Sequence, residues 1–214
     1  MARNETTKTA ISESSKTPYR FTSPRQPKTT YLLIPIVSSE NRRYIPVGYV
    51  SKDIITNNAN FTISNASLYT LGVLTSSVHM AWMRTVAGRL KSDYRYSNTI
   101  VYNNFIWPKV TEKNKSQIEK TAQMILDARA KHPTMSLAQL YDELTMPEDL
   151  RNAHTANDKA VMKAYGFKPS MTEPEIVAEL FKLYEVKLKE LEQEEKKKEE
   201  KSKATEKSRS GKAN

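Results

Sequence analysis

Hydrophobic and polar positions form short runs in the first half of the chain. Residues 30–37 (TYLLIPIV) and 43–50 (RYIPVGYV) are rich in β-branched and aromatic side chains, which is typical of strands. Pro35 and Pro46 have no backbone N–H, so each strand is predicted to be an edge strand or to be interrupted there. Further strands are predicted at residues 61–64 (FTIS), 67–74 (SLYTLGVL) and 98–105 (NTIVYNNF).

From Ser76 the hydrophobic period becomes helical. Apolar side chains recur at every fourth position, which predicts one buried stripe on a single helix over residues 76–92. This stripe consists of Val78, Trp82, Val86 and Leu90.

The rest of the chain is predicted to be helical because its helix-start signals agree with its hydrophobic stripes. Ser or Thr followed three residues later by Glu or Gln satisfies two free backbone N–H groups at a helix start. The spacing occurs at Ser116/Glu119, Ser136/Gln139, Thr145/Glu148 and Thr172/Glu175. Each pair precedes a helical stripe, so we expect a module of four helices.

These patterns predict an α+β protein in four parts. Residues 1–28 are rich in Ser, Thr, Lys and Pro and are expected to form a disordered arm. A β-rich segment with one long helix follows at 29–110, and the four-helix module at 111–191. Residues 192–214 are expected to be a charged helix extension that frays into a disordered tail.

Charge is distributed unevenly over these parts. The chain of 214 residues has a formal net charge of +10, and residues 31–110 carry +5 of it. Residues 111–185 carry −2, as an ordinary packing domain would. Because a basic balance attracts polyanions, the β-rich segment is the expected binding region. The N-terminus has no apolar signal segment and no run is long enough to span a membrane, so the expected location is the cytoplasm.

Few side chains in the sequence suggest catalysis. There is no cysteine, which excludes disulfides, Cys-based metal sites and thiol catalysis. The three histidines do not have metal-ligand spacing, and the five glycines form no phosphate-binding loop. The acidic pairs at 142–143 and 148–149 fall at helix ends, where capping explains them. The chain alone is therefore not expected to hold a metal or a cofactor, or to be catalytic.

Basic and aromatic residues interleave between residues 76 and 107. Cations neutralise phosphates, Arg and Asn read base edges, and hydroxyl groups fix the register on the backbone. A basic turn at 38–43 and Lys52 add to this set. The candidate DNA-binding residues are Arg42, Arg43, Lys52, Arg84, Arg89, Lys91, Tyr94, Arg95, Tyr96 and Asn98. The alternative is a basic solvated surface over an aromatic core.

Several blocks of the sequence resemble the C-terminal part of MmeI-like type IIG/IIL restriction–modification proteins. The family pattern has SSERRxYIP, a Ser-x-x-His-x-x-Trp-x-Arg helix with GRL, then YRYS, YNNFPWP and MPxxLxxAHxxLDxxV. Here these blocks are residues 38–46, 76–90, 94–97, 102–108 and 146–161. The chain departs from the pattern at Asn41, Ile106 and Asn157.

The resemblance implies the later part of a target recognition domain followed by a C-terminal helical domain. In that family the adenine-N6 methyltransferase core lies upstream, binds S-adenosylmethionine and is often fused to a Mg-dependent endonuclease. The motifs of neither activity occur in this sequence. Asn103-Asn104-Phe105 lacks both prolines of the family's catalytic loop and is not assigned to it. The chain is thus expected to be a recognition end, arising as a fragment, a split subunit or a truncated gene.

Three hypotheses follow. The first is a module that recognises double-stranded DNA for an adenine-specific methyltransferase, with Arg84 and Arg89 holding phosphate or a buried carboxylate and the turns 38–43 and 51–66 choosing the base. The second is a non-catalytic helical subunit that docks a methyltransferase core supplied by another chain. The third is an inert remnant.

Overall fold

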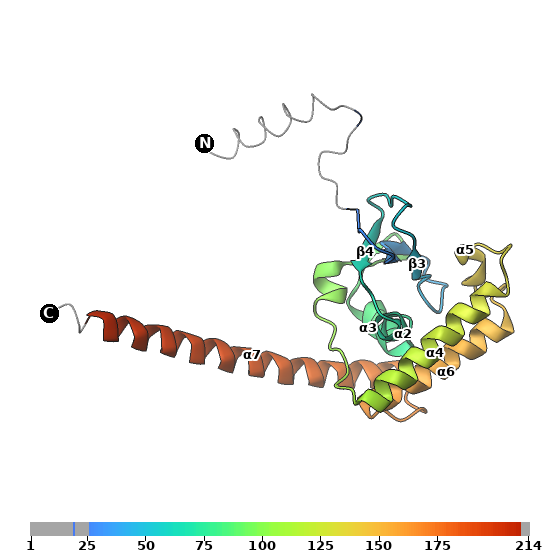
Figure 1. The fold of residues 1–214 in the computed structure, drawn as a ribbon. Helices are drawn as coiled ribbons and strands as arrows, with labels where there is room; N and C mark the ends of the chain where they lie inside the picture. The colour runs from blue at the N-terminus through green and yellow to red at the C-terminus, as the bar shows by residue number, and fades with distance from the viewer. Residues whose placement is uncertain (1–18, 20–25, 211–214) are drawn as a thin grey trace.

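The fold combines two small antiparallel sheets with helices, as the α+β prediction requires (Figure 1). The computed structural model describes residue 19 and residues 26–210, with the backbone alone for 199–210. The strands are β1 (Tyr31–Pro35), β2 (Val37–Ser38), β3 (Gly48–Val50), β4 (Asn60–Ser64), β5 (Gly88–Leu90) and β6 (Asp93–Arg95). The helices are α2 (Leu68–Leu74), α3 (Ser77–Val86), α4 (Glu112–Ala130), α5 (Leu137–Leu140), α6 (Glu148–Tyr165) and α7 (Glu173–Ser210), with a π-helix, η1 (Asn98–Tyr102). Of the arm predicted at 1–28, all but residues 19 and 26–28 lie outside the described residues.

The predicted strand over residues 30–37 is divided between the two sheets. Strand β1 lies between β3 and β4 in the first sheet, and β2 pairs with β6 in the second, in the order β2-β6-β5. The interruption falls at Ile36, directly after Pro35, which is the last residue of β1; the Ile36 N–H donates to the Ala59 carbonyl at 2.9 Å. The predicted strand over 43–50 is regular only in β3, after Pro46. Both interruptions agree with the effect expected of proline.

The strand predicted at 67–74 is wrong, because these residues form helix α2. The Ser67 side chain caps the helix by accepting from the Thr70 N–H at 3.2 Å. The last four residues of α2 are all buried. A helix buried on every side shows no polar face, so its period cannot be distinguished from that of a buried strand.

The long helix predicted over 76–92 is also wrong in its second half. Ser76 caps α3 by accepting from the His79 N–H, but the helix ends at Val86, and Ala87 is extended with φ −68° and ψ 146°. Residues 88–90 then form a strand, so Leu90 does not continue the buried stripe and is 51% exposed. The strand predicted at 98–105 is instead the π-helix η1 followed by a turn.

The four C-terminal helices are present, but only two of the predicted start signals act as caps. Ser136 and Gln139 form the complete capping box of α5. Glu175 accepts from the N–H of Thr172 at 2.7 Å at the start of α7. Ser116 lies inside α4, which Thr111 caps, and α6 begins after Pro147 without a side-chain cap. Helix α7 runs through the predicted boundary at 192 and projects far from the rest of the molecule (Figure 1).

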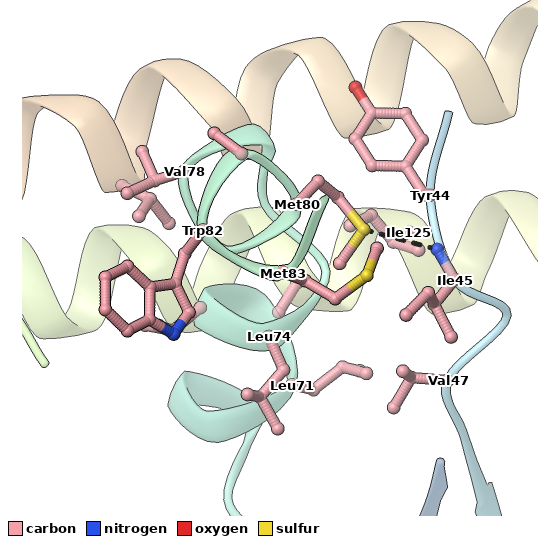
Figure 2. Close-up of a cluster of buried hydrophobic side chains, with 14 of the residues drawn as sticks. Tyr44, Ile45, Val47, Leu71, Leu74, Val78, Met80, Trp82, Met83 and Ile125 are labelled. Atoms are coloured by element: carbon pink, nitrogen blue, oxygen red, sulfur yellow. Dashed lines mark hydrogen bonds between the residues drawn. The ribbon is translucent and has the colours of Figure 1, made fainter. Parts of the chain in front are cut away.

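One hydrophobic core joins the β-rich segment to the C-terminal helices. Helices α2 and α3 pack against α4 and α6, and Trp82 of α3 faces Phe181 and Tyr184 of α7. Figure 2 shows Met80 and Met83 of α3 against the segment that carries Tyr44 and Ile45. The Ile45 N–H donates to the Met80 sulfur at 3.4 Å. The basic turn at 38–43 is therefore continuous with a segment buried in this core.

A glycine marks the closest approach of α2 to α4. A Cβ on Gly72 would lie 2.6 Å from the Ile118 side chain and 3.2 Å from its carbonyl oxygen. Gly72→Ala is expected to lower the free energy of unfolding by about 1–3 kcal/mol, because overpacking outweighs the gain in helix propensity. Urea unfolding measures this loss. Gly88→Ala is the control, since its Cβ would meet no atom within 4 Å, and an equal loss in both variants would contradict the steric cause.

Candidate nucleic-acid interface

The second sheet presents a basic hairpin. Strands β5 and β6 pair from Gly88↔Arg95 to Leu90↔Asp93, which leaves Lys91 and Ser92 as a two-residue turn. Lys91 has a positive φ of 57°, the left-handed conformation that such turns require. The side chains of Arg89, Lys91 and Arg95 are exposed. The hairpin thus carries three cations on eight residues of chain.

The turn at 38–43 lies beside this hairpin because β2 pairs with β6. The register places Val37 opposite Arg95 and Ser38 opposite Tyr94. At the start of the turn, the carboxylate of Glu40 lies 3.6 Å from Arg89. Arg43 is exposed and Arg42 is half-buried. The structure therefore brings together basic residues that are about fifty positions apart in the sequence.

Arg89 is held in place by its own hairpin. Its guanidinium lies 3.8 Å from the centre of the Tyr94 ring, and its Nη1 donates to the Ser92 carbonyl at 2.7 Å. Stacking on an aromatic face leaves the remaining N–H groups of an arginine directed outward. Tyr94 itself is 9% exposed, so it acts as the support for Arg89.

Arg84 is occupied inside the molecule. Its Nη1 lies 3.0 Å from the Glu173 carboxylate at the start of α7, and its Nη2 donates to the Arg43 carbonyl at 2.6 Å. Its side chain is only 20% exposed. Arg84 thus contacts a carboxylate, but Glu173 is exposed and is not the buried carboxylate that was expected.

Three candidates lie apart from the basic hairpin and turn. Tyr96 is 3% exposed and its hydroxyl is hydrogen-bonded to His79 Nε2 at 3.0 Å, so it lies beneath the surface and not on it. Asn98 is exposed at the start of η1, where its side chain accepts from the Thr99 N–H. Lys52 follows β3, and the end of β3 pairs with the start of β1. The turn at 38–43, in contrast, comes after the opposite end of β1. At about 3.3 Å per strand residue, Lys52 and the turn lie at opposite ends of β1.

A buried polar cluster lies behind the turn, and none of its residues is among the candidate sites predicted from the sequence. The Tyr44 hydroxyl donates to Asp158 Oδ2 at 2.7 Å, and the Ser77 N–H donates to Oδ1 at 2.7 Å. The Tyr44 ring stacks on His154 with centroids 4.1 Å apart. His154 and Asp158 are one helical turn apart on α6, and this i, i+4 spacing is the sequence signal by which they could have been found.

Burial sets the charge state of this cluster. It lowers the pKa of His154 to about 3, with a further contribution from Arg129, so the ring is neutral at pH 7. Burial also raises the pKa of the Asp158 carboxyl, against the hydrogen bonds from Tyr44 and Ser77 that lower it. His154 Nε2 is hydrogen-bonded to the Tyr141 hydroxyl at 2.7 Å, and Tyr141 in turn accepts from Arg129. The cluster links α4, α5 and α6 to the base of the basic turn.

Neither a metal-binding cluster nor a Gly-rich nucleotide turn lies in the part of the chain whose side chains the structure describes, residue 19 and residues 26–198. Within these residues, no three His, Asp or Glu side chains gather at a metal-binding distance. The four glycines of this region lie in different elements, Gly48, Gly72, Gly88 and Gly166, and build no Gly-rich turn for a nucleotide. Over the same residues, no helix is both long and apolar enough to cross a lipid bilayer.

Comparison with known proteins assigns both halves of the chain. A family model described as MmeI, target recognition domain, matches residues 1–109, and one described as MmeI, C-terminal domain, matches residues 110–192. The chain belongs to the MmeI family. The resemblance seen in the sequence is thereby confirmed.

Two relatives place the chain within the MmeI family. DNA methyltransferase A of Bacillus subtilis (strain 168) is 39% identical over 183 residues, which cover 86% of this chain and 21% of that protein. The structure of the type IIL restriction–modification enzyme MmeI in complex with DNA matches with a TM-score of 0.78 and 47% identity. That match covers 83% of this chain and 24% of MmeI. The chain thus spans about a fifth to a quarter of the relatives it matches.

Proposed function

We propose that this chain is the DNA-recognition portion of a site-specific adenine-N6 methyltransferase of a restriction–modification system. Its family and its likeness to MmeI, a protein whose structure was determined with DNA, support the proposal. The observation that carries it is the gathering of exposed cations from two separate segments on one small sheet. Lysine and arginine at such a surface displace the counterions of the phosphate backbone.

The exposed residues of the hairpin and turn are the proposed contacts. Arg43, Arg89, Lys91 and Arg95 meet the duplex, and Arg42 contributes from its half-buried position. Tyr94 and Tyr96 act from beneath, as supports for Arg89 and for the sheet. Asn98 and Lys52 stand at the margins of this surface, so a contact from either requires the duplex to extend past the hairpin.

Selection from a random duplex pool tests the proposal. The purified chain is titrated with the pool from low to moderate salt, and the bound DNA is sequenced. We expect a steep salt dependence together with an enriched motif, since phosphate contacts give the slope and base contacts the motif. A salt dependence without an enriched sequence motif would restrict the function to phosphate binding. Absence of binding at low salt would reject the proposed function.

Arg84→Ala is expected to weaken binding to all duplexes alike, by about three- to tenfold. The residue holds the Arg43 carbonyl and does not itself meet a base, so its loss displaces a phosphate-binding cation without changing base readout. Anisotropy titrations on three unrelated duplexes measure the effect. Loss of affinity for one sequence only would show that Arg84 reads a base.

Docking to a methyltransferase core is the second candidate function. Large apolar side chains remain exposed along α7, and an apolar pocket between α7 and the segment after η1 is lined by residues that include Trp107, Tyr165 and Val186. The exposed residues are Phe181, Leu183, Val186, Leu188 and Leu191. S-adenosylmethionine, and Mg for any nuclease, would then bind to that core in the cytoplasm. Co-purification with a core chain of the family, abolished by Val186→Glu, would support this function.

A further inference from the structure

Two contacts from the C-terminal helices converge on adjacent residues at the end of the basic turn. Glu173 of α7 holds Arg84 at 3.0 Å, and Arg84 donates to the Arg43 carbonyl at 2.6 Å. Asp158 of α6 accepts from the Tyr44 hydroxyl at 2.7 Å. Both acidic residues belong to the part matched by the MmeI C-terminal domain, whereas the turn belongs to the target recognition domain.

We propose that Glu173 and Asp158 are positioning residues, through which the C-terminal helices fix the basic turn 38–43 for DNA. The inference rests on the proposed function. It gives the C-terminal helices a part in DNA recognition even if they make no contact with DNA themselves.

The turn has little internal structure to fix its direction. Its hydrogen bonds are local, from the Arg42 N–H to the Ser39 carbonyl at 3.2 Å and from the Asn41 N–H to the Ser39 hydroxyl at 3.3 Å. On its N-terminal side, β2 contains only two residues. The direction of Arg42 and Arg43 therefore depends on how the C-terminal side of the turn is held.

Asp158 joins that side of the turn to helix α3, because its two carboxylate oxygens bind one residue of each. Oδ2 binds Tyr44, while Oδ1 binds the N–H of Ser77 in the first turn of α3. A carboxylate is favourable at a helix N-terminus, where N–H groups lack partners. The last turn of the same helix carries Arg84. One helix thus connects the Asp158 contact to the Glu173 contact, and the two reinforce each other.

Fixing the turn before DNA arrives increases affinity without adding a contact. Ordering flexible side chains during binding has a free-energy cost, and a preorganised surface avoids it. Where only a fraction of molecules holds the binding conformation, the apparent affinity falls by that fraction. Loosening either anchor is therefore expected to weaken binding although neither acidic residue meets DNA.

The decisive experiment compares Glu173→Ala with Glu179→Ala in the full chain. Both glutamates lie on α7 and both pair with a cation, Arg84 and Lys182 respectively. Each variant gains one formal positive charge, so simple attraction to DNA predicts equal or tighter binding for both. We expect Glu173→Ala to bind duplex about three- to fivefold more weakly, as loss of one partly exposed ion pair allows, and Glu179→Ala to bind unchanged.

Amide hydrogen exchange without DNA reports on the turn itself. Exchange at 39–47 is expected to accelerate in Glu173→Ala and, by about tenfold or more, in Tyr44→Phe, which removes only the hydroxyl bound to Asp158. Glu179→Ala should leave exchange there unchanged. Arg43→Ala should also reduce duplex affinity less in the Glu173→Ala background than in the unaltered chain, because Arg43 is then already misplaced. If Glu173 affected only the stability of the fold, the two reductions would be equal.

The outcomes separate this inference from the proposed function. If the unaltered chain binds DNA but Glu173→Ala matches Glu179→Ala in both exchange and affinity, the positioning role is overturned and the DNA proposal stands. Faster exchange without loss of affinity would overturn it as well. If the unaltered chain binds no duplex at low salt, the proposed function fails and the inference fails with it.

Discussion

Acidification from pH 6.5 to pH 4.5 is expected to lower the free energy of unfolding by up to about 5 kcal/mol. The cause is two buried histidines, His79 and His154, whose pKa burial lowers to about 3 in the folded chain. The His79 ring packs edge-on against Phe105 with centroids 4.5 Å apart and binds the Tyr96 hydroxyl. Neither ring can gain a proton without carrying a charge into the core.

The direction follows from proton binding in the two states. An unfolded histidine titrates near pH 6.5, so between about pH 6.5 and 3 the unfolded chain binds more protons than the folded one. The contribution of the two buried histidines to the free energy of unfolding is complete above pH 6.5. It is lost as the pH falls, at about 1.4 kcal/mol per pH unit for each histidine. The raised pKa of Asp158 acts in the opposite sense and offsets part of the loss. The lowered pKa values of Asp149 and Glu175 add to the loss from about pH 5 downward, as these carboxylates begin to take up protons in the unfolded chain.

Urea unfolding at pH 7, 6, 5 and 4.5, followed by tryptophan fluorescence, measures this dependence. His154→Gln retains a polar group for Tyr141 but removes one titration, so it should reduce the slope of stability against pH to about half. The variant has lower stability at pH 7, and only the slope is compared. A stability that stays constant between pH 6.5 and 4.5 in the unaltered chain would contradict burial of two neutral rings.

Local signals predicted the parts of the fold that depend on local contacts. The C-terminal helices follow from repeated hydrophobic stripes, and Ser136 and Gln139 cap α5 as their spacing indicates. The hydrophobic pattern gave the wrong secondary structure where contacts with residues distant in the sequence determine it. Residues 67–74 are helical because they lie against α3, α4 and α6, and this environment removes the polar face by which a helix is recognised. The bend at Ala87 likewise leads into a hairpin whose partner strand, β2, comes from a distant part of the sequence.

The candidate interface shows the same limit. Composition identified the basic residues, and the family resemblance gave them a partner, but neither distinguishes Arg95, which is exposed, from Arg84, which holds Glu173. Tyr96 is buried by a contact with His79 across 17 positions. Tyr44 and Asp158 are 114 positions apart, and their hydrogen bond depends on how α6 packs under the turn. Such contacts follow from tertiary packing and leave no periodic trace in the sequence.

Removing the four exposed cations of the hairpin and turn is expected to lower duplex affinity by about three orders of magnitude at 0.1–0.15 M salt. The variant combines Arg43→Ala, Arg89→Ala, Lys91→Ala and Arg95→Ala. If each cation neutralises one phosphate, the slope of log affinity against log salt should become less steep by about 3.6. Because all four side chains are exposed, the fold should be retained. Titrations at four salt concentrations give the affinity and the slope together.

A second variant with the same change of charge identifies the surface. Lys113→Ala, Lys120→Ala, Lys159→Ala and Lys163→Ala removes four exposed lysines from α4 and α6, helices that do not pack against β5 or β6 to any substantial extent. Exposed charges farther than about 10 Å from the phosphates are largely screened at 0.1 M salt, so this variant should retain most of the affinity and nearly the full slope. Equal losses in the two variants would mean that DNA is attracted by net charge alone. A loss confined to the first variant would assign the phosphate contacts to the hairpin and turn, because only the position of the four charges differs.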